Sequence, residues 1–135
     1  MSVRDAVLFA NEAFYRAFAD RDMRSMDQVW SSRLDVACLH PGWQPLFGRA
    51  AVMESWAAIL GNPQSPKIRA RDPKVQLCGE TAVVVCYEDL SGTFLVASNI
   101  YVREGQVWKL LLHQGGATAG APEPEKSPER PTRVN

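Results

Sequence analysis

The sequence changes its hydrophobic period near residue 67, and this change limits the folds that are open to the chain. Before it, apolar residues recur at helical spacing in residues 3–20 and again in residues 49–60. After it, apolar and polar residues alternate along segments 67–78, 81–90, 93–103 and 106–114, which we expect to be strands. Helices followed by a run of strands indicate the α+β class.

Three very short linkers connect these four predicted strands. They are Gly79-Glu80, Ser91-Gly92 and Glu104-Gly105, and each contains a glycine that permits a tight hairpin turn. Three successive hairpins predict an antiparallel meander, and Pro73 predicts a bulge or an edge in its first strand.

Two further elements are predicted before the meander. One is a short helix near residues 23–30, and the other is a strand over residues 34–40 that Pro41-Gly42 ends. With them, we expect a curved sheet that is covered on one face by the helices.

The C-terminal segment differs in composition from the rest of the chain. Residues 116–135 contain four of the nine prolines and none of the twelve aromatic residues. Such a segment has little to bury. We therefore expect one domain over residues 1–115 and a disordered tail over 116–135.

Charge and cysteine usage exclude several classes of function. Fifteen basic residues balance fifteen acidic ones, so nucleic acid is not an expected partner. The chain has neither an apolar run that could span a bilayer nor a signal-peptide pattern, which predicts a cytoplasmic protein without a membrane association. Cys38, Cys78 and Cys86 form an odd set without CxxC spacing, which favours reduced thiols over disulfides or metal ligands. No metal or cofactor is expected.

Several segments, in order and spacing, resemble a known family. They are Cys38–Trp43, Phe47–Arg49, Ala97–Tyr101, Trp108–Leu110 and His113-Gln114. Together they resemble the SnoaL-like branch of the nuclear transport factor two-like superfamily over residues 3–115. The resemblance implies a cone, in which a curved, largely antiparallel mixed sheet wraps the N-terminal helices around a pocket. Because this superfamily includes ketosteroid isomerases, scytalone dehydratase and kinase association domains, the fold alone does not define a function.

The resemblance makes His40 the candidate catalytic base. In the related isomerases an aspartate before a proline at the end of the first strand has this role, and His40 takes its place. Imidazole, with an unperturbed pKa of about 6.5, is a suitable base near neutral pH. The alternative is that His40 only caps the strand end. The isomerases' oxyanion donors correspond to Phe14, one residue before Tyr15, and to the neighbourhood of Ser98 and Asn99, so a steroid isomerase is disfavoured.

The alternation of side chains predicts which residues face the cavity. In the last strand, Lys109 prefers water, so we expect Trp108, Leu110, Leu112 and Gln114 to face inward and His113 outward. By the same logic, the inward set of the preceding strand is Phe94, Val96, Ser98, Ile100 and Val102, with Asn99 and Tyr101 outward. A bulge would exchange the two faces, so Asn99 and His113 remain candidate ligand-binding residues with Ser98 and Gln114.

Three aromatic residues, Tyr15, Trp43 and Trp56, are candidates for the pocket wall. The alternative for each is ordinary core packing, most strongly for Trp56 in the centre of its helix's apolar sector. Cys38 shares the strand phase of His40, but no spacing supports it as a nucleophile or metal ligand.

These observations predict a protein that binds an apolar small molecule. If it is an enzyme, the expected chemistry is cofactor-independent isomerisation, dehydration or polyketide-type cyclisation with His40 as base. The alternative is a non-catalytic oligomerisation or protein-interaction domain. We also expect a homodimer through the outer sheet face, where Tyr101 and Leu111 would form an apolar patch, with Phe9 as a further exposed apolar residue.

Overall fold

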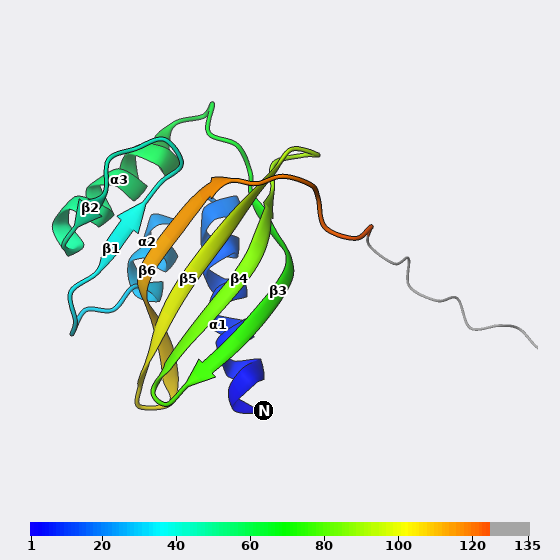
Figure 1. The fold of residues 1–135 in the computed structure, drawn as a ribbon. Helices are drawn as coiled ribbons and strands as arrows, with labels where there is room; N and C mark the ends of the chain where they lie inside the picture. Colours follow the sequence, from blue (N-terminus) through cyan, green and yellow to red (C-terminus); the bar gives the residue numbers. More distant parts are fainter. Residues whose placement is uncertain (125–135) are drawn as a thin grey trace, which may run out of the picture.

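The computed structural model describes residues 1–124 as three helices and six strands. The helices are α1 (Val3–Ala19), α2 (Met23–Val29) and α3 (Arg49–Gly61). The strands are β1 (Ala37–Leu39), β2 (Leu46–Phe47), β3 (Arg69–Cys78), β4 (Thr81–Asp89), β5 (Phe94–Glu104) and β6 (Val107–Ala117). Figure 1 shows α1 and α2 behind a bent sheet. The predicted α+β order is confirmed; only the two-residue β2 was not predicted.

The six strands form one mixed sheet in the order β2-β1-β6-β5-β4-β3. The meander from β3 to β6 is antiparallel, as predicted, while β1 lies parallel to β6 and antiparallel to β2. Pro73 lies in the edge strand β3, and the β3–β4 register shifts between Arg71 and Lys74. The predicted bulge and edge at this proline are therefore both present.

A bulge in β6 changes which of its side chains face inward. Ile100 pairs with Leu112 but Tyr101 pairs with Leu110, so Leu111 is an extra residue in β6. Before the bulge, Trp108 and Leu110 are buried as predicted. After it, His113 is buried and Gln114 is exposed, so the prediction for these two residues was wrong.

The inward set of β5 is also the opposite of the predicted one. Ala97, Asn99 and Tyr101 are fully buried, whereas Ser98 and Ile100 lie on the outer face and are only partly covered. Both sets contain enough apolar residues to fill a core, so hydrophobicity did not separate them. A buried polar network, described below, accounts for the inward position of Asn99.

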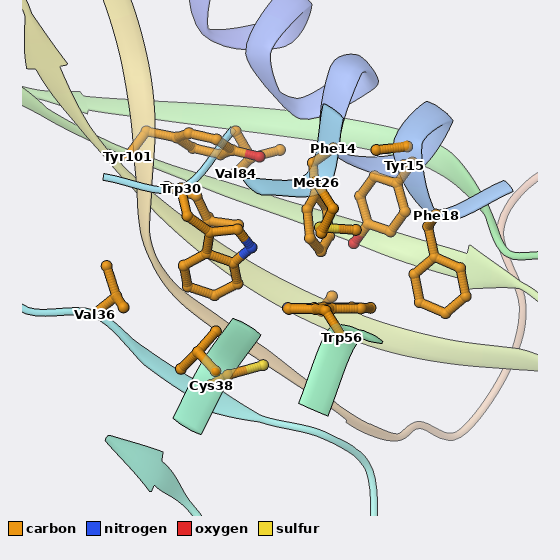
Figure 2. Packing of buried hydrophobic residues seen from close by; sticks show 14 of the residues in the cluster. Phe14, Tyr15, Phe18, Met26, Trp30, Val36, Cys38, Trp56, Val84 and Tyr101 are labelled. Atoms are coloured by element: carbon orange, nitrogen blue, oxygen red, sulfur yellow. The ribbon is translucent and has the colours of Figure 1, made fainter. Parts of the chain in front are cut away.

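The space between the helices and the sheet is filled by a largely aromatic core. The ring of Phe14 lies edge-on to that of Trp56 at 5.5 Å between centroids, and Phe18 approaches Trp56 at 5.2 Å. Figure 2 shows these three rings close together in the core. Edge-to-face packing of this kind stabilises a core beyond its buried area.

Arg21, in the turn between α1 and α2, fixes the loop that follows α3. Its guanidinium donates to the carbonyl oxygens of Leu60, Asn62, Pro63 and Ser65 at 2.6–3.4 Å. One side chain thus joins the C-terminal ends of two helices, and the loop that it holds forms one wall of the pocket described below.

The last strand continues past the predicted domain end at residue 115. Gly116 and Ala117 pair with Val96 and Leu95, so two residues of the predicted tail belong to the sheet. Further on, Arg71 donates to the carbonyl oxygen of Glu123 at 3.0 Å. The remaining part of the predicted tail, residues 125–135, lies outside the described residues.

Candidate functional site

A pocket of about 350 Å³ lies where β1, β4 and β6 meet the loop after α3. Its polar, charged and aromatic members include His40, Trp43, Glu88 and His113. The apolar part of its wall and the loop residues are Phe18, Pro41, Ala58, Ile59, Asn62, Ser65, Pro66 and Ile68. A volume of this size suits a small organic molecule.

A larger groove, of about 500 Å³, lies between α1, α2 and the β5–β6 hairpin. None of the described residues that line it is a buried titratable side chain: Arg16, Asp20 and Asp22 are exposed, and Lys109 donates to a backbone carbonyl at the surface. The smaller pocket is the better candidate because it contains buried acid–base groups, which cluster at functional sites.

His40 follows β1 and projects inward, because it shares the strand phase of buried Cys38. Its Nε2 lies 2.9 Å from Ser55 Oγ, and the Ser55 hydroxyl donates to the carbonyl oxygen of Val52 at 2.6 Å. The serine oxygen is therefore left to accept from His40 Nε2–H, and Nδ1 carries the lone pair. Burial lowers the pKa of His40 to about 4, so its imidazole is neutral at ordinary pH.

The two predicted tryptophans lie on different sides of His40. Trp43 is half exposed and its ring lies 4.7 Å from that of His40, at the pocket mouth. Trp56 lies 4.8 Å from His40 but is fully buried, in contact with Phe14 and Phe18. Trp43 thus lines the pocket, while Trp56 supports His40 from the core.

His113 is the second buried imidazole of the pocket. Its Nδ1 lies 2.6 Å from Asn99 Oδ1, and its ring centroid lies 6.4 Å from that of His40. Burial, together with the neighbouring His40, lowers the pKa of His113 to about 3. Both imidazoles are therefore uncharged near neutral pH, with a lower affinity for a proton than an exposed histidine has.

Glu88 is the pocket residue that sequence reasoning missed. It is 2% exposed, and its Oε2 accepts a hydrogen bond of 2.8 Å from the Tyr15 hydroxyl. Burial raises the pKa of Glu88 to about 7, although the Tyr15 hydrogen bond acts in the opposite direction. A signal was present: in the strand predicted at 81–90, Glu88 continues the alternating stripe of Ala82, Val84 and Cys86.

The absence of a side chain at residue 115 makes room for this carboxyl. A Cβ at Gly115 would lie 3.2 Å from Glu88 Oε1 and 3.3 Å from Pro41 Cγ. This separation is at the lower limit of ordinary packing, so glycine at this position leaves the carboxyl unhindered beside the pocket.

Glu88 and His113 form a close pair in which burial opposes the charged form of both groups. His113 Nε2 lies 3.8 Å from Glu88 Oε2, which is within the distance of an ion pair. Burial, however, raises the pKa of the carboxyl and lowers the pKa of the imidazole, so the proton stays on Glu88. At pH 7 the Glu88 carboxyl is therefore protonated in about half of the molecules, and in more of them at lower pH, beside a deprotonated imidazole.

Tyr15 and Asn99 do meet, but their hydrogen-bond donors are already used. The Tyr15 hydroxyl donates to Glu88, and Asn99 Nδ2 donates to Tyr15 Oη and to Asn11 Oδ1, both at 3.0 Å. Neither residue lines the pocket. They support Glu88 and His113 rather than offering the free oxyanion donors of an isomerase.

The other predicted residues do not reach the pocket. Ser98 and Gln114 lie on the outer sheet face. Cys38 is buried beside His40, and burial raises the pKa of its thiol to about 12, which makes it a poor nucleophile. Among residues 1–124, no group of three or more His, Cys, Asp or Glu side chains is placed to bind a metal ion. Nor does that part of the chain contain a helix long and apolar enough to cross a membrane.

Solved structures of the same fold carry different functional descriptions. A candidate dehydratase of the nuclear transport factor two-like family from Streptomyces avermitilis is 31% identical, with a TM-score of 0.78 over 87% of this chain and 96% of that one. A candidate calcium/calmodulin-dependent protein kinase type II association domain from Thiobacillus denitrificans is 28% identical, with a TM-score of 0.69 over 82% and 93% of the two chains. The CaMKII hub from S. rosetta, at 20% identity and a TM-score of 0.69 over 85% and 96%, shares the fold.

Sequence comparison agrees with the structural one. No curated protein matches the chain. The family model of the SnoaL-like domain, in contrast, matches residues 7–119, which run from the second turn of α1 to just past the end of β6. The chain therefore belongs to the SnoaL-like domain family, within the nuclear transport factor two-like fold.

Proposed function

We propose that the pocket binds an uncharged, hydroxyl-bearing small molecule and catalyses the elimination of water by acid–base chemistry without a cofactor. The observation that carries the proposal is the pairing of Glu88 with His113 at 3.8 Å, beside the second neutral imidazole of His40. Acid and base functions within one site are what a dehydration requires.

The separation of the pair suits a hydroxyl group of the substrate. An oxygen about 2.8 Å from each atom fits between His113 Nε2 and Glu88 Oε2. There the hydroxyl donates its hydrogen to His113, and its oxygen accepts a hydrogen bond from the protonated Glu88 carboxyl. The pair thus holds the group that is to leave.

His40 then serves as the base, as the resemblance implies. Its Nδ1 removes a proton from the carbon next to the one that bears the hydroxyl, and the C–H electron pair becomes the new C=C bond. The C–O bond breaks, Glu88 gives its proton to the departing oxygen, and water leaves. One imidazolium and one carboxylate remain, and proton exchange with solvent restores the neutral groups.

The pocket wall favours an uncharged substrate. None of the described residues that line it is a lysine or an arginine, so a carboxylate or phosphate group would be desolvated there without a counter-charge. Trp43 offers a ring face at the mouth for an aromatic or cyclic compound. The Streptomyces avermitilis neighbour described as a candidate dehydratase supports the same reaction class.

The test uses the β-hydroxy ketone formed from benzaldehyde and acetone, because its dehydration gives the strongly absorbing benzylideneacetone. We expect turnover by the wild-type chain and a loss of about 10²- to 10⁴-fold in Glu88→Gln and in His40→Ala, the usual contribution of a positioned acid or base. Glu54→Gln, on the exposed face of α3, is the matched control and keeps full activity. Equal turnover in Glu88→Gln and wild type would refute the proposal.

A second role, self-association, is favoured by the outer face of the sheet. A hollow there is lined by Phe47, Ile100, Leu111 and Leu112, and the Phe47 side chain is 75% exposed. Tyr101, which was predicted for this patch, is fully buried. We propose a homodimer through Phe47 and Leu111, in keeping with the kinase association domain among the structural neighbours. Light scattering should give a dimer mass for wild type and a monomer mass for Phe47→Glu. A monomer mass for wild type would exclude the proposed homodimer.

A further inference from the structure

A chain of hydrogen bonds runs behind the pocket from Tyr101 to His113. The Tyr101 hydroxyl lies 2.9 Å from Asn11 Oδ1, Asn11 Oδ1 lies 3.0 Å from Asn99 Nδ2, and Asn99 Oδ1 lies 2.6 Å from His113 Nδ1. All four side chains are at most 2% exposed. Of these four residues only His113 lines the pocket, and Asn99 also reaches the pocket residue Glu88 through the Tyr15 hydroxyl.

The donor and acceptor roles along these hydrogen bonds follow from the Tyr101 hydroxyl. Burial raises the pKa of Tyr101 well above its usual value, so the phenol keeps its proton, and Asn11 Oδ1 is the acceptor within reach. The Asn11 amide must therefore present its oxygen, which then also accepts from Asn99 Nδ2. Asn99 is left with its own oxygen toward His113, and this oxygen requires a proton on His113 Nδ1.

Tyr15 reinforces the same direction at the middle of the chain. Its hydroxyl donates to Glu88 Oε2 at 2.8 Å, so its oxygen is left to accept from Asn99 Nδ2 at 3.0 Å. Turning the Asn99 amide would place its oxygen against two acceptors, Asn11 Oδ1 and the Tyr15 oxygen. Reversal thus requires the Asn11 amide to turn as well, which leaves the buried Tyr101 hydroxyl without an acceptor.

We propose that Tyr101, acting through Asn11 and Asn99, is a specificity-determining residue that makes the site accept a hydroxyl group in preference to a carbonyl group. With Nδ1 protonated, His113 offers the Nε2 lone pair, while the Glu88 carboxyl across the 3.8 Å gap offers a proton. An acceptor beside a donor matches a hydroxyl, which both gives and receives a hydrogen bond. With the chain reversed, Nε2–H and Glu88 would both be donors, and they would match a carbonyl oxygen.

This inference rests on the proposed function for its catalytic meaning, but its primary readout does not depend on turnover. ¹⁵N NMR of the imidazoles of the full chain distinguishes a protonated from a bare ring nitrogen. At neutral pH we expect His113 of the wild type to show a protonated Nδ1 and a bare Nε2. The opposite tautomer in the wild type would overturn the proposal before any variant is made.

The decisive variant is Tyr101→Phe, which keeps the ring and removes only the hydroxyl that orients Asn11. We expect its His113 spectrum to move toward the Nε2–H tautomer. Tyr87→Phe, which removes a phenol on the outer sheet face, is the matched control and leaves the spectrum unchanged. A natively folded Tyr101→Phe with the wild-type tautomer would show that Tyr101 does not set the direction.

A binding measurement with two probes of matched shape tests the specificity itself. Methyl phenyl carbinol carries a hydroxyl where acetophenone carries a carbonyl. NMR titration gives the affinity of each probe. The affinity for the carbinol divided by that for acetophenone should be about 2- to 10-fold lower in Tyr101→Phe than in wild type, the factor that one net hydrogen bond provides. An unchanged ratio together with a changed tautomer would overturn the specificity role. The tautomer and the affinity ratio could both change as expected while the wild-type chain fails to dehydrate the β-hydroxy ketone. In that case the proposed function is refuted, but the role of Tyr101 in setting the donor and acceptor of the site is supported.

Discussion

Along β4, the inward side chains run from Ala82 and Val84 at one end of the sheet to Cys86 and Glu88 at the other. At the Ala82 end, Leu110 and Trp30 fill the space behind the sheet and are at most 1% exposed. At the Glu88 end, burial is nearly as complete, but the buried groups are a carboxyl and two imidazoles beside a pocket.

The two ends show how one core serves opposite purposes. Apolar burial at the Ala82 end stabilises the fold directly. Burial at the Glu88 end instead opposes ionisation, and it shifts the pKa of Glu88 upward and those of His40 and His113 downward. Burying these three groups lowers the stability of the fold at any pH where they would be charged in the unfolded chain, and it favours their neutral forms in the pocket.

The largest expected effect comes from the apolar end. Trp30 is 1% exposed, so Trp30→Ala should lower the free energy of unfolding by about 3–5 kcal/mol. Denaturant unfolding measures it. Trp43→Ala, at the half-exposed pocket mouth, is the control and should cost less than about 1 kcal/mol. Similar costs for the two variants would remove the distinction between the ends.

A pH-dependent effect of the opposite sign is expected at the polar end. Because the pKa of Glu88 is raised to about 7 from 4.5, its contribution to stability is fully present below pH 4.5 and is lost as pH rises through 7. Glu88→Gln keeps an acceptor for Tyr15 and cannot ionise. It should therefore be more stable than wild type by about 1–3 kcal/mol at about pH 8 and should show little gain at low pH.

The two histidines limit the stability of the wild-type protein at acidic pH. Their pKa values are lowered to about 4 for His40 and about 3 for His113 from 6.5, so the stability linked to them is present above pH 6.5 and lost as pH falls through these values. Glu54→Gln, on the exposed helix face, should follow the wild-type curve at every pH. Thermal melts across the pH range measure these curves. A Glu88→Gln curve parallel to that of wild type would contradict the raised pKa of Glu88.

A smaller effect is expected where glycine leaves room for Glu88. Gly115→Ala places a Cβ 3.2 Å from Glu88 Oε1, so either the carboxyl or Pro41 must shift, at a cost of about 1 kcal/mol. Turnover should fall by more than this cost suggests, because the acid moves relative to His113. Gly116→Ala, where a Cβ meets nothing within 4 Å, is the control. Equal activity of the two variants would show that the position of the carboxyl is not critical.

The smallest effect is expected from removal of the C-terminal segment. The last strand ends at Ala117, and Arg71 makes a hydrogen bond to the Glu123 carbonyl beyond it. Because the Arg71 hydrogen bond to the Glu123 carbonyl is solvent-exposed, its loss should cost little, and a chain that ends at residue 117 should melt within a few degrees of the full chain. A much lower melting temperature would assign residues beyond the sheet to the folded domain.

Most of the fold could be predicted from local sequence signals. Helical periodicity located α1 and α3, and the glycine of each two-residue linker located the hairpins, where Gly79, Gly92 and Gly105 all adopt positive φ. The phase of β6 could not be predicted beyond its bulge. In the run Leu110-Leu111-Leu112 each residue is equally apolar, so no contrast in the sequence marks Leu111 as the extra one.

The site could be predicted only in part. His40 was found through a family resemblance, because a histidine before a proline at a strand end stands where related enzymes have a base. Trp43 was found as an aromatic residue that flanks His40 in the following turn. Asn99 was assigned to the outer face because the alternate set of residues in its strand was predicted to face inward. Its inward position depends on Asn11 and His113, partners 88 and 14 residues away in the sequence. Partners so distant leave no periodic signal.

The most direct test of the account is the titration of the Glu88 carboxyl itself. ¹³C NMR of the side-chain carboxyl in the wild-type chain, assigned by its absence in Glu88→Gln, gives the midpoint without any substrate. We expect a midpoint at about pH 7, with both imidazoles still neutral there. A midpoint near the ordinary value of 4.5 would place a carboxylate in the pocket at neutral pH and would contradict the role of Glu88 as the acid.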